Sequence, residues 1–177
     1  MLKLKEKFIS SDKIFDGKML KLNVDKVLLP NGKTSSREVV LHPGAVAILP
    51  ILPNGDIVFV KQYRYPINSI IYEIPAGKLE VGEEPLECAI RELSEETGYE
   101  TNDLTFLTAI TTTPGFSNEI IHLYLAKNLI KTTQHLDEDE FINVEVLPIS
   151  KIKELILNGK IYDSKTLSAL LMYELIK

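Results

Sequence analysis

The chain has 177 residues, of which 45% are hydrophobic and 25% are charged, and 20 basic against 25 acidic side chains give a formal net charge of −5. This length suits one domain with a short appendage. An acidic balance without basic blocks argues against nucleic-acid binding, which needs a cationic surface. The longest apolar run, residues 45–52, is too short to span a membrane. Cys88 is the single cysteine and cannot form an internal disulfide, so we expect a cytoplasmic protein.

The N-terminal segment predicts strands and turns. Leu20, Leu22 and Val24 alternate with polar residues, which is typical of a half-buried strand. A second apolar stretch, residues 27–29, runs into Pro-Asn-Gly at 30–32, which is a strong turn signal. We therefore expect a small N-terminal β hairpin.

A second hairpin is predicted from two further apolar runs. Residues 45–52 and 57–60 flank another Pro-Asn-Gly at 53–55. Continuous apolar runs of this kind indicate strands that are covered on both faces.

The hydrophobic period changes from two to about 3.6 after Gly77. Apolar residues then recur at i, i+3, i+4 and i+7, which predicts a helix whose buried face comprises Leu86, Ala89, Ile90 and Leu93. Pro85 suits the first turn of this helix and Gly98 suits its end. Further along the chain we expect strands at 104–112, 120–126 and 141–147, an acidic loop at 131–140, and helices at 150–157 and 164–176. Strands flanked by helices indicate a layered α/β domain.

Three carboxylates share one face of the helix that follows Gly77. Glu92 and Glu96 are i, i+4 neighbours and Glu95 lies beside them, so their charges repel. Hard divalent cations such as Mg²⁺ prefer oxygen ligands and would offset this repulsion. The alternative is a solvated acidic face on which Arg91 pairs with Glu87 or Glu95.

The wider sequence context favours the metal site. Residues 77–99, GKLEVGEEPLECAIRELSEETGY, fit the pattern G-x5-E-x7-R-E-U-x-E-E-x-G-U, in which U is bulky and apolar. The fixed positions are occupied by Gly77, Glu83, Arg91, Glu92, Leu93, Glu95, Glu96, Gly98 and Tyr99. This stretch resembles the Nudix box.

The resemblance implies a fold, an activity and a set of roles. The expected fold is an α/β/α sandwich around a mixed central sheet at residues 41–177, with the N-terminal β appendage at residues 1–40. The expected activity is hydrolysis of a nucleoside diphosphate linked to another group, with two or more Mg²⁺ or Mn²⁺ ions. The implied metal ligands are Glu92, Glu96 and the backbone carbonyl of Ala76, with Glu95 in support, Arg91 orienting a catalytic carboxylate and Glu83 nearby.

Residues outside the box are similar to the ADP-ribose pyrophosphatase branch of the family. These segments are KQYRYP at 61–66, EIPAG at 73–77, REVV at 37–40, HPGAV at 42–46, and Pro114, sixteen residues beyond Gly98. The resemblance implies substrate contacts by Arg37, Glu38, Arg64, Thr113, Pro114, Gly115 and Glu119. Each also has an ordinary interpretation: Arg64 as an edge-strand cation, Arg37 and Glu38 as strand-solvating residues, and residues 113–115 as a plain turn.

The acidic loop LDEDEF at 136–141 is either a solvated connection or part of the site. In the branch that this chain resembles, a carboxylate on the matching mobile loop acts as base or as a metal ligand. We expect Glu138 to be the base and Glu140 a metal ligand, with the reverse assignment left open.

The leading hypothesis is hydrolysis of ADP-ribose to AMP and ribose 5-phosphate. The alternatives are another nucleotide sugar, such as GDP-mannose or a UDP-sugar, and an ADP-ribose sensor without turnover. We also expect a homodimer formed through the N-terminal segment, because a lone hairpin needs another surface to cover it. Neither nucleic acid nor a membrane is an expected partner.

Overall fold

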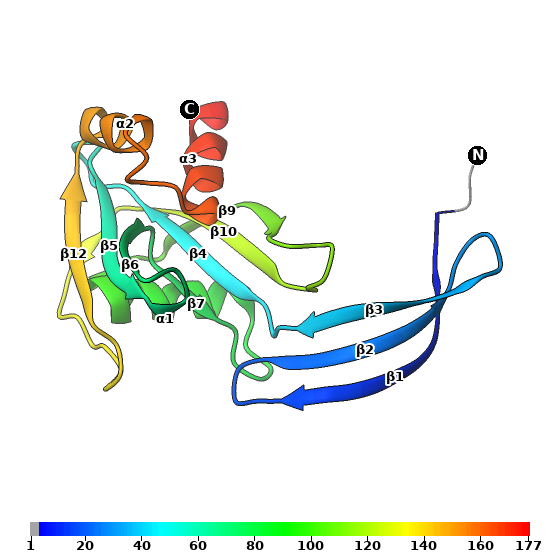
Figure 1. Cartoon of the computed structure of the whole chain (residues 1–177). Coiled ribbons are helices and arrows are strands. Elements are labelled where there is room, and N and C mark those ends of the chain that lie inside the picture. The colour runs from blue at the N-terminus through cyan, green and yellow to red at the C-terminus, as the bar shows by residue number, and fades with distance from the viewer. Residues whose placement is uncertain (1–3) are drawn as a thin grey trace. The chain divides into compact units, whose positions relative to one another are not determined.

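The structure is a computed structural model that describes residues 4–177. Its elements (Figure 1) are β1 (Lys7–Asp16), β2 (Lys21–Leu28), β3 (Thr34–Leu41), β4 (Ala45–Pro50), β5 (Ile57–Arg64), the 3₁₀ turn η1 (Tyr65–Ile67), β6 (Ser69–Glu73), β7 (Ala76–Lys78), α1 (Pro85–Thr97), β8 (Tyr99–Glu100), β9 (Asp103–Thr111), β10 (Ile120–Lys127), β11 (Ile130–Lys131), β12 (Ile142–Leu147), α2 (Ile149–Leu157) and α3 (Ser164–Ile176). Contacts divide the chain into two compact units. The first runs to Gly44 and includes Thr111–Ile120, and the second comprises Ala45–Ile110 and Ile121–Lys177.

The first unit is built on an antiparallel sheet with the strand order β1-β2-β3. The predicted hairpin is present as β2 and β3. Its turn is closed by a 3.0 Å hydrogen bond from Gly32 N to Leu29 O, and Gly32 has a positive φ of 83° that favours glycine. The additional strand β1 pairs along the whole of β2, so the appendage has three strands where the sequence predicted two.

The second unit contains the mixed sheet that the sequence predicted. Its strand order is β7-β4-β10-β9, with β4 parallel to β10 and antiparallel to β7. A separate antiparallel sheet has the order β12-β5-β6, and the short strands β8 and β11 form a third pair.

Strand β4 is buried on both faces, which explains its continuous apolar sequence. Val46 and Ile48 pack with Ala89 and Leu93 of α1. The alternate face of β4 joins a larger cluster with β5, β10, α2 and α3, which includes Ala47, Leu49, Phe59, Leu123, Ile152, Leu155, Ala169 and Leu170. The sheet therefore lies between α1 and the pair α2 and α3, and the predicted α/β/α layering is confirmed.

The second predicted hairpin exists only at its tip. Ile51 and Ile57 form one antiparallel bridge, and Leu52 N donates to Asp56 O at 2.9 Å across the turn. Beyond that bridge β4 and β5 pair with other strands and enter different sheets. The buried backbone of each strand needs hydrogen-bond partners along both edges, and β10 beside β4 and β12 beside β5 come from distant parts of the chain.

No helix in the described part of the chain is long and apolar enough to cross a membrane.

Candidate metal centre and substrate site

Helix α1 carries the carboxylates, and both of its ends are fixed by the residues that the sequence suggested. Pro85 occupies the first turn, and Gly98 ends the helix with φ 63° and donates from its N–H to Ser94 O at 2.9 Å. The predicted apolar face is only half correct, because Ala89 and Leu93 are buried while Leu86 and Ile90 are exposed. The buried face is turned toward the carboxylates and comprises Cys88, Ala89, Leu93, Glu96 and Thr97.

Glu92 lies against the backbone of Gly77. A Cβ built on Gly77 would stand 1.8 Å from Cδ of Glu92, which is far too close for two atoms that are not bonded to each other. The first glycine of the motif is therefore required so that the carboxylate of Glu92 can approach the backbone at the start of β7. Burial raises the pKa of Glu92, and the neighbouring charges of Glu95 and Glu140 act in the same direction.

Glu96 is almost completely buried, and its side chain reaches the same stretch of backbone. Its Oε2 accepts a hydrogen bond from Ala76 N at 2.9 Å. Burial, together with the charges of Glu92 and Glu140, raises the pKa of Glu96 to about 8, although the hydrogen bond from Ala76 and the charge of Arg64 act in the opposite direction. A buried carboxylate among other carboxylates is unfavourable unless a cation offsets its charge.

Arg91 ties three acidic residues together. Its Nε and Nη2 donate to the two carboxylate oxygens of Glu83 at 2.9 and 3.1 Å, and its Nη1 donates to Glu92 and Glu95 at 2.8 and 2.9 Å. These bonds raise the pKa of Arg91, and the bond from Arg91 lowers the pKa of Glu83 to about 2. The i, i+4 pair of Arg91 with Glu95 that the sequence allowed is present, and it is part of a network that also orients Glu92.

Cys88 lies on the same helix but is buried. Burial raises the pKa of its thiol to about 12, so the thiol stays protonated at neutral pH. It donates to Lys78 O at 3.3 Å and packs in the cluster beneath β4. Cys88 therefore has a packing role.

The segment before the acidic loop is anchored to the C-terminal end of α1. Thr132 N donates to Gly98 O at 2.7 Å, and His135 N donates to Glu95 O at 3.0 Å. Nε2 of Gln134 donates to Glu96 O at 2.6 Å. These bonds satisfy carbonyl groups that a helix end leaves free. Because a Cβ on Gly98 would lie 2.8 Å from Gln134 N, the second glycine of the motif also permits this approach.

The anchored loop brings Glu140 toward the carboxylate face. Glu140 is half-buried, its N–H donates to Asp137 O at 3.0 Å, and its charge raises the pKa of both Glu92 and Glu96. Glu138 is exposed on the same loop. Of the two loop residues that the sequence singled out, Glu140 is thus the one close to the box.

The donor set fits a hard divalent cation. Within residues 4–177, no three His, Cys, Asp or Glu side chains are grouped so that they could hold a metal ion as they stand. Glu92 and Glu96 nevertheless bring their carboxylates to the backbone of Gly77 and Ala76, and the donors that they offer there are oxygen atoms. Mg²⁺ and Mn²⁺ select such donors, whereas softer metals select sulfur and nitrogen.

Arg64 ends β5 and is held by a residue that the sequence analysis did not single out. Its Nε and Nη2 donate to the carboxylate of Glu73 at 2.8 and 3.2 Å. Glu73 is buried and also contacts the ammonium group of Lys165 at the start of α3. The EIPAG segment that contains Glu73 was visible in the sequence. Nothing near Glu73 in the sequence indicates a contact with Lys165, which lies 92 residues further along the chain.

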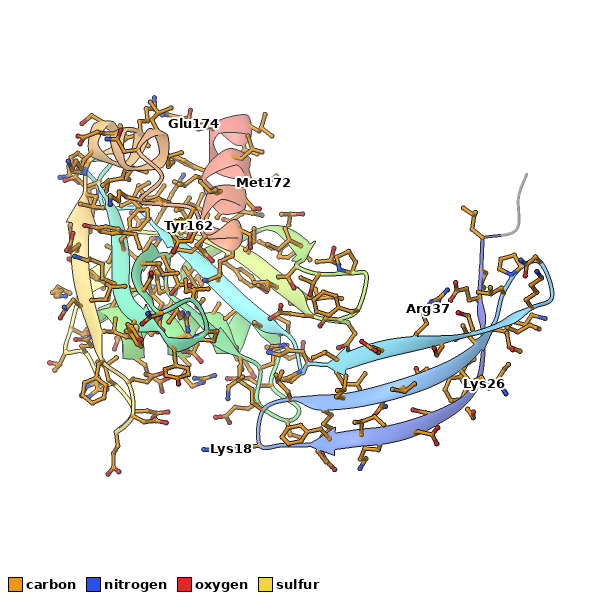
Figure 2. All side chains as sticks on the ribbon, in the orientation of Figure 1. Lys18, Lys26, Arg37, Tyr162, Met172 and Glu174 are labelled. Carbon is orange, nitrogen blue, oxygen red and sulfur yellow. The ribbon has the colours of Figure 1, made fainter. Side chains whose placement is uncertain are left out.

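The first unit contains the other predicted substrate residues. Arg37 lies on β3 (Figure 2) and its guanidinium is paired with Glu6, with 3.1 Å between Nε and Oε2. Arg37 and Glu38 are neighbours on one strand, so their side chains point to opposite faces of the sheet. Because β3 is an edge strand, a ligand that lies along this edge can contact both.

The turn at 113–115 is bonded to the end of β3 within the same unit. Phe116 N and Ser117 N donate to Thr113 O, and Val40 N donates to Phe116 O at 2.7 Å. Thr113, Pro114 and Gly115 are exposed. Glu119 accepts a hydrogen bond from the hydroxyl of Thr112 at 2.5 Å, which fixes its carboxylate beside the turn. The first unit therefore brings the two predicted groups of substrate residues together.

Comparisons with known proteins show what this chain is similar to. The NUDIX domain family matches residues 41–170. The chain is 52% identical to the methanol dehydrogenase activator of Bacillus methanolicus, over 93% of this chain and 90% of that protein. It is 49% identical to the ADP-ribose pyrophosphatase of Bacillus subtilis (strain 168), over 96% and 93% of the two chains. A crystal structure of an ADP compounds hydrolase has the same fold, with a TM-score of 0.86, 23% identity and coverage of 97% of this chain and 94% of that one.

Proposed function

Because the chain belongs to the Nudix family, we propose that it hydrolyses the pyrophosphate bond of ADP-ribose to AMP and ribose 5-phosphate, with Mg²⁺ or Mn²⁺ as cofactor. The observation that supports this most directly is that the carboxylates of Glu92 and Glu96 both reach the backbone at the start of β7, Glu92 against Gly77 and Glu96 on the N–H of Ala76. The near full-length similarity to an ADP-ribose pyrophosphatase supports the substrate.

The metal ligands in this proposal are Glu92, Glu96, Glu140 and the carbonyl oxygen of Ala76, with two or more ions per site. A divalent cation bound there neutralises the pyrophosphate charge and activates water for attack on phosphorus. Glu95 supports this ligand set through Arg91, whose guanidinium also holds Glu92 in the orientation observed. Arg91 thus limits the rotation of a carboxylate that must bind metal.

Glu138 is the proposed general base. It is exposed on the acidic loop, so it reaches the attacking water only when this loop closes over bound substrate. If Glu140 is a metal ligand, a higher metal concentration should restore part of the rate of Glu140→Gln but not of Glu138→Gln. The reverse assignment, with Glu140 as base, predicts the opposite.

The proposed substrate contacts fall into two groups. Arg64 binds the phosphates, because a guanidinium can donate two parallel hydrogen bonds to a phosphate group. Arg37 and Glu38 bind the nucleoside end, and Glu119 beside the turn at 113–115 binds a ribose hydroxyl. The guanidinium groups of the two arginines suit phosphates, and the carboxylates of Glu38 and Glu119 can accept hydrogen bonds from sugar hydroxyls. These groups together support recognition of a sugar nucleotide.

The test is hydrolysis of a substrate panel by the purified chain. With Mg²⁺ or Mn²⁺ we expect ADP-ribose to yield AMP and ribose 5-phosphate, faster than GDP-mannose or a UDP-sugar is cleaved, and EDTA should abolish the reaction. Much faster cleavage of GDP-mannose would transfer the proposal to that substrate. Tight binding of ADP-ribose without any turnover would favour a sensor.

A second candidate function comes from the relative that is 52% identical. Its name describes activation of a methanol dehydrogenase, and the similarity covers 93% of the present chain. The test is the rate of a purified methanol dehydrogenase with and without this protein and Mg²⁺. A rate increase that the Glu96→Gln variant does not produce would connect activation to the carboxylate site.

The protein also forms a homodimer through its N-terminal segment in this proposal, and it acts in the cytoplasm. Support for the dimer comes from β1, in which Phe8, Ile9, Ile14 and Phe15 are exposed. An uncovered apolar strand of this kind is an interaction surface or an aggregation hazard. Cys88 as the single, unpaired cysteine supports a reducing compartment.

A further inference from the structure

A buried group of charges lies behind Arg64 and joins β5, β6 and α3. Glu73 is 2% exposed and Lys165 is 8% exposed. The Glu73 carboxylate accepts hydrogen bonds from Nε and Nη2 of Arg64. Lys165, at the start of α3, contacts Oε1 of the same carboxylate. Lys165 also bonds Asp163 Oδ1 at 3.1 Å. Arg64 is 40% exposed at its side chain, so it is the member of the group that faces solvent.

The start of α3 is clamped to the end of β6 through the same residues. Asp163 caps the helix by accepting from Thr166 N at 3.0 Å and from its hydroxyl at 2.6 Å. Oγ1 of Thr166 accepts in turn from Ile74 N at 3.0 Å. The residue after Pro75 is Ala76, whose N–H bonds Glu96, so this clamp adjoins the proposed metal ligands.

We propose that Lys165 and Glu73 are positioning residues that hold Arg64 for the substrate phosphates. This inference rests on the proposed function, since it names how one substrate contact of that reaction is oriented. Glu73 occupies one edge of the guanidinium, and within residues 4–177 no acceptor bonds Nη1. The free edge is the one that can donate to a phosphate oxygen.

Lys165 matters because one carboxylate is shared between two cations. Lys165 contacts Oε1 of Glu73, which also accepts from Nη2 of Arg64, so the carboxylate is fixed from both sides. Asp163 pairs in turn with Lys165, so the four side chains together are neutral and the role of Lys165 is to hold the carboxylate in place. A guanidinium that is already oriented loses less conformational freedom when substrate binds.

A double-mutant cycle on steady-state kinetics tests this coupling. Arg64→Ala should raise KM about tenfold to a hundredfold, the loss expected for charge-assisted hydrogen bonds. Lys165→Met should raise KM about fivefold to tenfold with kcat changed less than about twofold. In the Arg64→Ala background the Lys165→Met change should add almost nothing, because Lys165 acts through Arg64. An equal effect in both backgrounds would overturn the inference, as would no effect of Lys165→Met on KM.

The matched control is Lys151→Met, which removes an ammonium group from an exposed i, i+3 pair with Glu154 on α2. It should leave KM unchanged. If Lys165→Met does not fold, as judged by its melting curve, the cycle uses Glu73→Gln/Lys165→Met, which leaves neither Glu73 nor Lys165 charged. That variant should show the same dependence on Arg64.

A second measurement separates this inference from the proposed function. The cycle uses whichever nucleotide sugar the wild type hydrolyses fastest, so cleavage of a substrate other than ADP-ribose refutes only the proposed substrate. If no nucleotide sugar is hydrolysed, the proposed function fails, and the ¹H–¹⁵N NMR signal of Arg64 Nε decides the positioning role. We expect Lys165→Met, but not Lys151→Met, to shift this signal and to speed its hydrogen exchange. An unchanged signal would overturn the inference.

Discussion

Strand β1 of the first unit and strand β4 of the second contrast sharply in burial, although both carry apolar side chains. All ten residues of β1 are exposed, whereas five of the six residues of β4 are buried. Among the described residues, the first unit buries one apolar side chain, Val27, and every other member of the hydrophobic core belongs to the second unit. The second unit therefore supplies its own stability and holds the carboxylates, while the first supplies surface.

If the second unit carries the chemistry, its carboxylates should show the largest effects on activity. Glu92→Gln and Glu96→Gln should each lower kcat about a thousandfold, since each removes a metal ligand worth several kcal/mol of transition-state stabilisation. Glu87→Gln is the matched control, because Glu87 is exposed on the same helix. Steady-state rates with saturating Mg²⁺ measure the difference, and similar rates for all three variants would contradict the assigned face.

The contrast in burial predicts a comparable contrast in stability. Phe59 is fully buried in the cluster between β5 and the helices, so Phe59→Ala should lower the free energy of unfolding by about 3–5 kcal/mol. Phe8 in β1 is 66% exposed, and Phe8→Ala should cost less than about 1 kcal/mol. Urea unfolding of both variants measures this. Equal losses would show that the β1 sheet is buried in solution.

Two glycines of the second unit separate a loss of activity from a loss of stability. Gly77→Ala forces its Cβ against the carboxylate of Glu92, so we expect kcat to fall about a hundredfold as this ligand is displaced. Gly159 follows α2 with a φ of 66°, and a Cβ built on it would meet open space. Gly159→Ala should lower the free energy of unfolding by about 1 kcal/mol and leave kcat unchanged. Retained activity in Gly77→Ala would mean that Glu92 is free to move.

Local patterns in the sequence predicted much of the second unit and of its carboxylate site. Helix α1, its terminal residues Pro85 and Gly98, and the shared face of Glu92 and Glu96 all follow from spacing within one segment. The layered fold follows from runs that are apolar at every position, such as β4. These features depend on contacts that lie near in sequence or on burial alone.

Features that depend on distant contacts were not visible in the sequence. The separation of β4 and β5 into two sheets depends on pairing with β10 and β12. The contact of Glu73 with Lys165 joins residues 92 positions apart, and a buried lysine contradicts the usual preference of that residue for the surface. The face that α1 buries was misassigned because Glu96 is held inward by the backbone of Ala76, which periodicity of apolar residues does not reveal.

The remaining prediction concerns the exposed apolar strand, and its effect on activity is the smallest. If β1 is covered by a second copy, Phe8→Asp/Ile14→Asp should convert a dimer into a 19.9 kDa monomer in light scattering at micromolar concentration. Because Arg37 and Glu38 lie in the same sheet, we expect KM for ADP-ribose to rise about twofold to tenfold with kcat nearly unchanged. Leu157→Asp is the control, since Leu157 is also an exposed apolar side chain, at the end of α2 in the other unit. It should leave both the dimer and KM intact. A wild type that is monomeric and fully active, or a dimer that survives the double substitution with unchanged KM, would show that the interface and the substrate contacts do not depend on β1.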